Sequence, residues 1–291
     1  MITAAAPFRL HASQAQCPYK DLFIYYLQGR ITPGGPAFEG LIGNWEEQDT
    51  SFLFFSVPAL EQVERLLTAQ PQLALVDHFQ MSYDQWQGDL FEPLQVGRFR
   101  VSPPWAPRVP ADTVGTGTML PLMLDPGVVF GTGTHPTTRD CLAALELAWD
   151  RLPAKTVLDL GTGSGLLAIA AALLGARRVL AIDINLLAVR TAARNILLNN
   201  LQNRIVAVQG KAEDFIHQSA DMIIANIHFE IMEALIGSRA FSNGQRFILS
   251  GLLRTEAKQV ETRLHQTGAR ILRQWSHEGT WHTFYGQTTV T

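Results

Sequence analysis

Apolar residues recur along the chain in two patterns, and the change between them falls at about residue 122. In the first part, Pro58 opens a predicted helix that reaches about Ala69. Residues 31–40 contain two prolines and three glycines, which predicts a loop without a helix. Short apolar runs bounded by turn residues predict strands at 21–28, 41–45, 52–57 and 73–79, with 46–49 as a hairpin turn. Together they predict a small α+β domain over residues 19–97.

From about residue 122 onward, strand-like and helix-like patterns alternate. The predicted strands span residues 156–160, 178–182, 205–209, 222–225, 246–250, 270–275 and 281–286. The predicted helices span residues 137–149, 164–175, 185–199, 229–236 and 255–267. Such alternation predicts an α/β fold over residues 122–291, with a doubly wound, mostly parallel, seven-stranded sheet. The short connection at residues 277–280 predicts that the last two strands form a terminal antiparallel hairpin.

Two segments lack either pattern. Residues 1–18 are predicted to be a flexible tail. Residues 98–121 are predicted to be a linker between the two domains, because prolines and a glycine turn disfavour regular structure there. The prolines are Pro103, Pro104, Pro107 and Pro110, and the turn is at residues 115–117.

Composition narrows the class of protein. A chain of 291 residues with 47% hydrophobic and 17% charged residues suits a globular protein of two domains. The net charge of −3 and the lack of any Lys/Arg-rich run argue against direct nucleic-acid readout, although local arginine clusters remain compatible with it. Cys17 and Cys141 lie far apart without metal-like spacing, so no metal is expected and a reducing cytoplasm fits best. No signal peptide or membrane-spanning run is apparent, so no membrane partner is expected.

The most informative segment is Val-Leu-Asp-Leu-Gly-Thr-Gly-Ser-Gly-Leu at residues 157–166, followed by Leu-Ala-Ile-Asp at 180–183. It has the layout of a strand, a glycine turn, a helix and a second strand that ends in the carboxylate of Asp183. Glycines allow close approach of the backbone to a ligand, and the acid suits a ribose diol. A dinucleotide-binding turn would place its third glycine where this chain has Leu166, which disfavours nicotinamide and flavin cofactors.

The spacing of Asp159, Gly161, Gly163 and Gly165 resembles the first motif of the class I S-adenosylmethionine-dependent methyltransferases. The resemblance implies S-adenosylmethionine as the cofactor. This cofactor has no phosphate, so its carboxylate is expected to use the N–H groups and positive end of the helix opened by Ser164.

A second motif lies upstream, Asp-Pro-Gly-Val-Val-Phe-Gly-Thr-Gly-Thr-His-Pro-Thr-Thr at residues 125–138. Read alone, it is a loop and a helix start, with Thr137 or Thr138 as the capping residue, or a lid over a ligand. The string closely resembles a motif of the ribosomal protein L11 methyltransferases, the PrmA family. The likeness also covers Asn195, Asn199 and residues 83–86, 103–105, 159–171, 183–185, 225–227, 249–253 and 281–286.

The resemblance implies roles for individual residues. Thr138, Gly161, Asp183 and Asn226 match cofactor-contacting positions, and Gly163 belongs to the same turn. Phe130, Gly131, Thr132 and Gly133 match the loop that closes over the cofactor. Asn226 ends the apolar strand at 222–225, where ligands bind in such sheets, and its amide oxygen is expected to orient the amine that is methylated. The alternative for Asn226 is a plain turn residue at the end of a strand.

Other polar residues have weaker functional readings. His228 is either a catalytic base or a structural histidine, and the resemblance does not require a histidine there. His277 and His282 flank the final hairpin without the partners that a metal site needs. Glu213 and Asp214 follow the third strand of the sheet, where they either contact an adenine or form a solvated acidic turn.

The resemblance implies a cytoplasmic protein-lysine N-methyltransferase that acts on a large-subunit ribosomal protein of the L11 type. In that family the N-terminal domain recognises the substrate and has a helix between its first two strands. Here that place is taken by the loop at residues 31–40, which puts the protein substrate in question. The alternatives are a lysine of another protein, a small-molecule acceptor, and a noncatalytic protein that binds the cofactor.

Overall fold

The computed structural model describes residues 18–32, 37–88, 93–106, 119–238, 241 and 244–289. The chain divides into two compact units between Glu92 and Pro93, and each unit is described by itself. The predicted tail, residues 1–18, lies outside the described residues except for Pro18.

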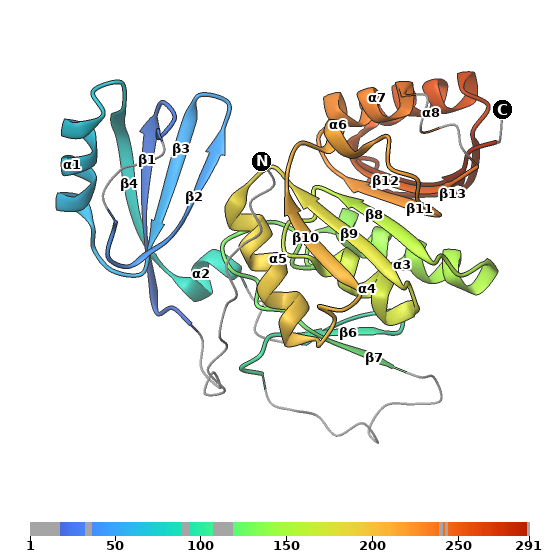
Figure 1. Ribbon diagram of the computed structural model, residues 1–291, viewed down its shortest axis with the longest axis horizontal. Coiled ribbons are helices and arrows are strands. Elements are labelled where there is room, and N and C mark those ends of the chain that lie inside the picture. The colour runs from blue at the N-terminus through green and yellow to red at the C-terminus, as the bar shows by residue number, and fades with distance from the viewer. Residues whose placement is uncertain are drawn as a thin grey trace. The chain divides into compact units, whose positions relative to one another are not determined.

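The N-terminal unit is a four-stranded antiparallel sheet with strand order β2-β3-β1-β4 (Figure 1). Its strands are β1 (Asp21–Gln28), β2 (Leu41–Glu47), β3 (Thr50–Phe55) and β4 (Ala74–Ser82). Its helices are α1 (Leu60–Ala69) and the short α2 (Tyr83–Gln87), which the sequence did not predict. Every pair of neighbouring strands in this sheet is antiparallel.

The connection between β1 and β2 crosses over β3, because β1 and β2 are both antiparallel to β3 and lie on its two sides. Its described residues, 29–32 and 37–40, contain no helix, as the sequence predicted. Two glutamines at α1 hold this crossover. Gln70 accepts hydrogen bonds from the Thr32 N–H at 2.9 Å and hydroxyl at 2.7 Å, and Gln62 accepts from the Glu39 N–H at 2.8 Å. The crossover is thus attached to α1 by side-chain amides.

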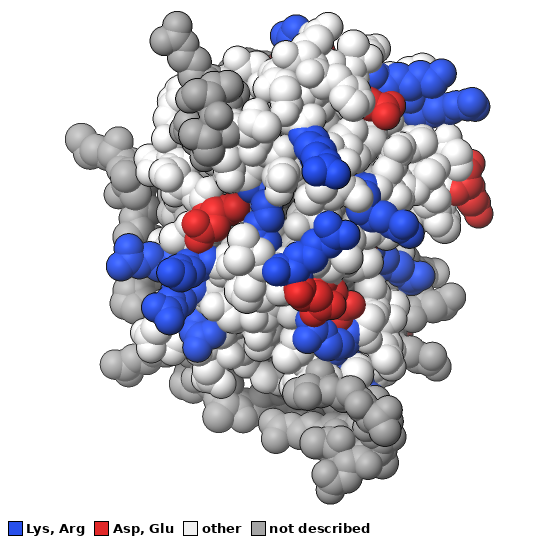
Figure 2. Space-filling model, turned by 90° about the vertical axis from the view of Figure 1, so that its right-hand side faces the viewer, with Lys and Arg blue, Asp and Glu red and all other residues white. Residues whose placement is uncertain are grey.

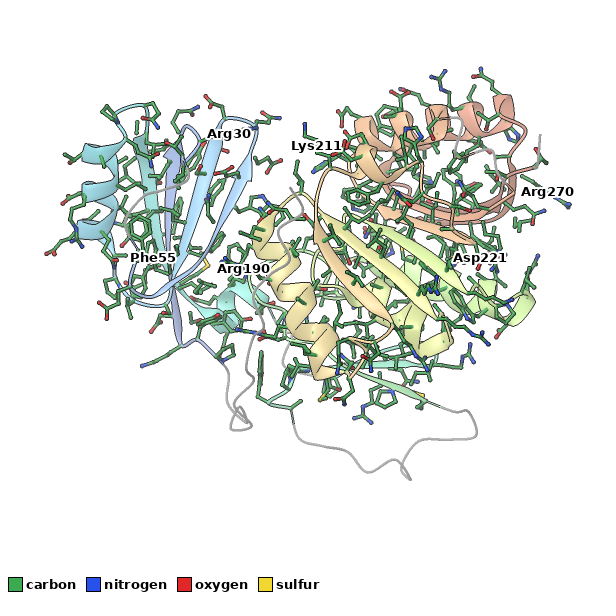
Figure 3. All side chains as sticks on the ribbon, in the orientation of Figure 1. Arg30, Phe55, Arg190, Lys211, Asp221 and Arg270 are labelled. Carbon is green, nitrogen blue, oxygen red and sulfur yellow. The ribbon has the colours of Figure 1, made fainter. Side chains whose placement is uncertain are left out.

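The core of the N-terminal unit lies between α1 and one face of the sheet. Phe55 of β3 is fully buried there, together with Val63 and Leu66 of α1 (Figure 3). Tyr25 also lies in this core, and its hydroxyl accepts a hydrogen bond of 2.8 Å from the N–H of Ala59, the residue before α1. This bond joins the central strand to the start of the helix.

The C-terminal unit is built on a seven-stranded sheet with strand order β10-β9-β8-β11-β12-β14-β13. The strands from β10 to β12 in this order are parallel, and β14 is antiparallel to both β12 and β13. The sequence therefore predicted the α/β class and the mostly parallel sheet correctly. The strands are β8 (Thr156–Leu160), β9 (Arg178–Asp183), β10 (Ile205–Gln209), β11 (Met222–Asn226), β12 (Arg246–Leu253), β13 (Arg270–His277) and β14 (Trp281–Gln287).

Helices cover both faces of this sheet (Figure 1). One core cluster joins the sheet to α3 (Pro136–Arg151), α4 (Leu166–Leu174) and α5 (Leu186–Leu198). The other joins it to α6 (Ala212–Phe215), α7 (Phe229–Gly237) and α8 (Arg254–Gln266). None of the described helices combines the length and apolarity that a membrane crossing requires.

The prediction of a linker over residues 98–121 is wrong at both ends of this range. Residues 94–96 (β5), 99–102 (β6) and 120–123 (β7) form a three-stranded sheet. Phe99 and Val101 are buried in the core beside α3 and α4, while Arg100 and Ser102 between and after them are not. This alternation is a strand pattern that the nearby prolines obscured in the sequence. The remainder of the predicted linker, residues 107–118, lies outside the described residues.

Replacing Tyr25 by Phe is expected to destabilise the N-terminal unit by about 1–3 kcal/mol, because the buried N–H of Ala59 loses its acceptor. Chemical denaturation followed by circular dichroism measures this change. Tyr26→Phe is the matched control, since Tyr26 is only half-buried and its hydroxyl accepts no such bond among the described residues. Equal stability of the two variants would contradict the role of the Tyr25 hydroxyl.

Candidate active site

The strand order places a topological switch point between β8 and β11. The region at the carboxyl ends of these two strands is called the crevice below. The chain runs from β8 to β9 and β10 on one side, then returns to add β11 and β12 on the other side of β8. At such a switch point the connections leave in opposite directions, and ligands bind at the carboxyl ends of the strands. The glycine turn that follows β8 and Asn226 at the end of β11 meet at this place, as the sequence predicted.

The glycine turn fits closely between two other segments. Gly161 and Gly163 both have positive φ angles, 70° and 55°. A Cβ atom on Gly161 would lie 2.2 Å from Cγ2 of Ile227, and one on Gly163 would lie 2.5 Å from the carbonyl oxygen of Phe130. A side chain at either position would displace the turn, so both glycines are required by backbone angle and by space.

Asp183, at the end of β9, holds the glycine turn in place. One carboxylate oxygen accepts a hydrogen bond of 2.9 Å from the N–H of Gly163, and the other accepts one of 2.9 Å from the N–H of Asn185. Burial raises the pKa of Asp183, although these backbone N–H groups act to lower it. The N–H of Ile184 also acts on this carboxylate, and three donors leave at least one of its four lone pairs for a ligand hydroxyl.

Asp159 is a second buried acid at this site, and the sequence analysis assigned it no role. It accepts a hydrogen bond of 2.6 Å from the Thr162 hydroxyl and another from the N–H of Ala168 in α4. Burial raises its pKa to about 7, and the nearby charge of Asp183 adds to this effect. A carboxylate inside an otherwise apolar strand was the signal in the sequence that pointed to it.

The sequence predicted that a ligand carboxylate uses the N–H groups at the start of the helix opened by Ser164, but the N–H groups of Ser164 and Gly165 already have acceptors within the protein. The Ser164 N–H donates to the Phe130 carbonyl at 3.0 Å, and its hydroxyl donates to the Gly131 carbonyl at 2.7 Å. The Gly165 N–H donates to the Thr162 carbonyl at 2.9 Å. The two Ser164 donors therefore hold the upstream loop, residues 125–135, against the glycine turn.

Asn195 of α5 is fully buried and joins the two motifs. Its amide oxygen accepts from the Asp125 N–H at 2.8 Å. Its amide nitrogen donates to the Asp125 carbonyl at 2.9 Å and to the Ser164 carbonyl at 2.8 Å. An ion pair of 3.0 Å between Arg194 and Asp125 adds to this attachment. The start of the upstream loop, the glycine turn and α5 are thus fixed relative to one another.

Thr138 lies in the first turn of α3 and is 1% exposed. Its hydroxyl has no hydrogen-bond partner among the described residues. A buried polar group of this kind usually has a partner, so the Thr138 hydroxyl is a candidate contact for a ligand. The predicted capping of α3 by Thr137 or Thr138 is wrong, because the ring of His135 accepts from the Thr137 N–H and caps the helix instead.

Asn226 is the last residue of β11 and pairs in register with Ser250 of β12. Its side-chain amide makes no hydrogen bond with any described residue. Gly251 follows Ser250 at an irregularity in β12, and a Cβ atom there would lie 3.0 Å from the Asn226 amide oxygen. The glycine therefore leaves room for this amide at the mouth of the crevice.

Three aromatic rings form a cluster that the sequence analysis did not foresee. The rings of His135 and Trp281 meet edge to face with centroids 4.9 Å apart, and Phe130 lies 5.4 Å from His135. Burial lowers the pKa of His135, and His277 lowers it further, so the ring is neutral at pH 7. Phe130 is 50% exposed, which leaves part of the cluster open to a ligand. Trp281 begins β14, far from the loop in sequence, so no local pattern linked these residues.

The remaining predicted polar residues lie at the starts of α6 and α7 or on the final hairpin, where His277 pairs in register with Trp281. His228 precedes α7 and makes no capping bond. His277 lies 3.9 Å from Glu278 in an exposed pair, and His282 lies 3.3 Å from Gln274. Glu213 and Asp214 are exposed in the first turn of α6, so they remain open to either reading. The described residues contain no cluster of His, Cys, Asp and Glu suited to a metal ion.

Comparison with known proteins decides the family. The family model of ribosomal protein L11 methyltransferases (PrmA) matches residues 58–289. The chain belongs to this family. The matched range includes the upstream loop, the glycine turn, Asp183 and Asn226, so the whole crevice lies within the PrmA match.

Individual members of the PrmA family agree. The ribosomal protein L11 methyltransferase of Carboxydothermus hydrogenoformans is 38% identical over 193 residues, which are 66% of this chain and 61% of the relative. That of Desulforamulus reducens is 33% identical over 255 residues, 87% of this chain and 76% of the relative. The crystal structure of a ribosomal protein L11 methylase from Lactobacillus delbrueckii subsp. bulgaricus superposes with a TM-score of 0.54 and 29% identity, over 66% of this chain and 96% of that one. The chain thus spans about three-fifths of the length of the first of these relatives.

Replacing Asn195 by Ala is expected to lower the free energy of unfolding by about 3 kcal/mol or more, because three backbone groups lose their partners. Urea denaturation measures the change. Asn203→Ala, at an exposed turn, is the matched control and is expected to have little effect. A similarly small effect at Asn195 would show that the amide does not hold these segments together.

Replacing Asp159 by Asn is expected to alter how stability depends on pH. The folded state binds the Asp159 proton more tightly than the unfolded state, because its pKa is about 7 rather than 3.8. The free energy of unfolding of the parent protein therefore falls as pH rises from about 4 to about 7, and Asn removes this contribution. Relative to the parent, the variant should gain at least ~1 kcal/mol across this window, since a tenfold change in proton affinity is worth about 1.4 kcal/mol. Parallel stability profiles from urea denaturation at several pH values would contradict this.

Proposed function

We propose that this chain is an S-adenosylmethionine-dependent protein-lysine N-methyltransferase whose substrate is ribosomal protein L11. Membership of the PrmA family supports this function. The observation that carries the proposal is the Asn226 amide, which makes no hydrogen bond with the described residues and lies beside the glycine turn at the switch point of the sheet. In this reading, the C-terminal unit is a class I methyltransferase domain that ends in the β13/β14 hairpin.

The residues of the crevice fit the cofactor. Asp183 would accept hydrogen bonds from the ribose hydroxyls, and Gly161 and Gly163 would allow the backbone to approach the ligand closely. The unpartnered hydroxyl of Thr138 would bond to the methionyl part. Phe130, Gly131, Thr132 and Gly133 would cover the ligand from the upstream loop. When bound, S-adenosylmethionine supplies a methyl group that is activated by a positively charged sulfur atom.

The protein must then present a neutral amine and exclude water. A free lysine has a pKa of about 10.4, so its deprotonation at pH 7 costs roughly 4–5 kcal/mol. Burial lowers that pKa, because an apolar environment disfavours the charged form. The Asn226 amide oxygen would accept one N–H of the neutral amine and so direct its lone pair, without acting as a base. The rings of Phe130, His135 and Trp281 would pack on the aliphatic part of the lysine.

We assign substrate recognition to the N-terminal unit, which the sequence predicted over residues 19–97 and which ends at Glu92. A lysine of a different protein is the second candidate, and two observations favour it. The crossover between β1 and β2 has no helix in its described residues. The family match begins only at residue 58, after the first three strands of this unit.

The function is tested by incubating the full chain with labelled S-adenosylmethionine and unmethylated recombinant L11, and then locating the label by mass spectrometry. We expect the label on lysine side chains of L11. Label on another protein of a cell extract, with none on L11, would favour the second candidate. Label confined to small molecules or nucleic acid would refute the assignment to a protein methyltransferase.

Replacing Asn226 by Ala is expected to lower turnover by about 100-fold, because the acceptor amine loses its orientation. Cofactor affinity, measured by calorimetry, should change little if Asn226 acts mainly on the amine. Asn203→Ala is again the control, since it lies outside the crevice. Near-normal turnover of the Asn226 variant would refute its catalytic role.

A further inference from the structure

A row of exposed cations lies along the amino-terminal edge of the seven-stranded sheet, opposite the crevice. Each member stands at or next to the start of a strand or at the end of α3. The edge row consists of Arg151, Lys155, Arg177, Arg178, Arg204 and Arg270, and all six are exposed. Figure 2 views the side of the molecule on which Arg270 and Asp221 are labelled in Figure 3, and Lys and Arg outnumber Asp and Glu there.

Backbone hydrogen bonds show that much of this row is contiguous. The N–H groups of Arg177 and Arg178 both donate to the Lys155 carbonyl, at 2.9 and 3.1 Å. The Arg204 carbonyl accepts from the N–H of Val179 at 2.8 Å. Arg270 starts β13 at the far edge of the sheet. With neighbouring strands about 4.8 Å apart, six spacings from β10 to β13 give the row a length of roughly 29 Å.

Neighbouring carboxylates offset only part of the charge of the edge row. Among the described residues, no carboxylate forms an ion pair with any of the six. Asp221 lies on the same edge, and the N–H groups of Lys155 and Thr156, at 2.7 and 2.8 Å, help to keep its pKa low, so it offsets one of the six positive charges. Asp150, next to Arg151, pairs instead with Arg98 at 3.3 Å. The row therefore keeps a net positive charge.

Some of these cations offset the negative carboxyl-terminal ends of helices, but this role accounts for only part of the positive charge. Arg246, which is buried, donates to the carbonyl oxygens of Ala148 and Leu152 at the end of α3. Arg204 donates to the Ala172 carbonyl near the end of α4 at 3.2 Å. Such cations offset the negative ends of helices. The side chains of Lys155, Arg177, Arg178 and Arg270 make no hydrogen bond to any described carbonyl, so they are free for a partner.

We propose that the edge row binds the phosphate backbone of duplex RNA. Five of its six members are arginines, whose planar guanidinium groups match phosphate oxygens in pairs. A duplex presents phosphates over a length comparable to that of the row. The row contains no aromatic side chain on which single-stranded bases would stack. Binding is therefore independent of base sequence and separate from the methyl-transfer crevice. The choice of RNA over DNA rests on the proposed function.

Fluorescence anisotropy of the full chain with a labelled 20-base-pair RNA duplex tests this proposal, in the absence of cofactor and L11. We expect a Kd of roughly 1–100 µM at physiological salt, with tighter binding at low salt and weaker binding as salt rises. Arg177→Gln combined with Arg178→Gln should reduce the salt slope by about 2 and weaken binding about 10-fold at low salt. The matched control is Arg190→Gln with Lys211→Gln, which removes the same charge at the opposite end of the unit (Figure 3).

Several results would overturn the proposal. The first is that the RNA duplex does not bind. The second is that the control variant loses as much affinity as the Arg177/Arg178 variant. The third is that a DNA duplex of the same sequence, or anionic vesicles, bind more tightly than the RNA duplex. Thermal melting must first show that both double variants are folded; if the Arg177/Arg178 variant is not, Arg270→Gln with Arg151→Gln replaces it. Since no methyl transfer is measured, failure of the proposed enzymatic function leaves the binding result unaffected.

Discussion

The side-chain amide of Asn195 is the contact on which the geometry of the crevice depends. It is fully buried, and it bonds to backbone groups of two segments that α3 separates in the sequence. These are Asp125 at the start of the upstream loop and Ser164 in the glycine turn. In a low-dielectric interior, such bonds are strong when every partner is satisfied and costly when one is missing. The loop therefore has one favourable position against the turn, and Phe130 is held where it can meet both Ser164 and His135.

Two buried acids complete this arrangement. Asp159 bonds to Thr162 and to the start of α4, whereas Asp183 bonds to Gly163 and to the start of α5. Both have pKa values raised by burial, so the site keeps carboxylates where their ionisation is unfavourable. A positively charged ligand nearby would offset that penalty. The polar groups that shape the turn thus also set the electrostatics of the crevice.

Much of this organisation was predictable from local patterns. Residues 156–183 show a strand, a glycine turn, a helix and a second strand so clearly that every predicted bound lies within two residues of the observed one. The errors arose where a distant partner decides the structure. The N–H group of Ser164 appeared free because its acceptor, the Phe130 carbonyl, lies more than thirty residues earlier in the chain. The contact between Trp281 and His135 forms only when β14 takes its place in the folded sheet, because the two residues lie far apart in the sequence. The strand at Phe99–Ser102 was hidden by the prolines that follow it.

The crossover between β1 and β2 has a consequence for the evolution of the protein. Glutamine amides attach it to α1, through Gln62, which is half-buried, and Gln70, which is buried at the end of the helix. Insertions in such a segment cost little free energy, because the entropy of closing a loop grows only with the logarithm of its length. Changes in the length of this crossover can therefore alter the surface beside α1 without requiring changes in the seven-stranded sheet of the other unit.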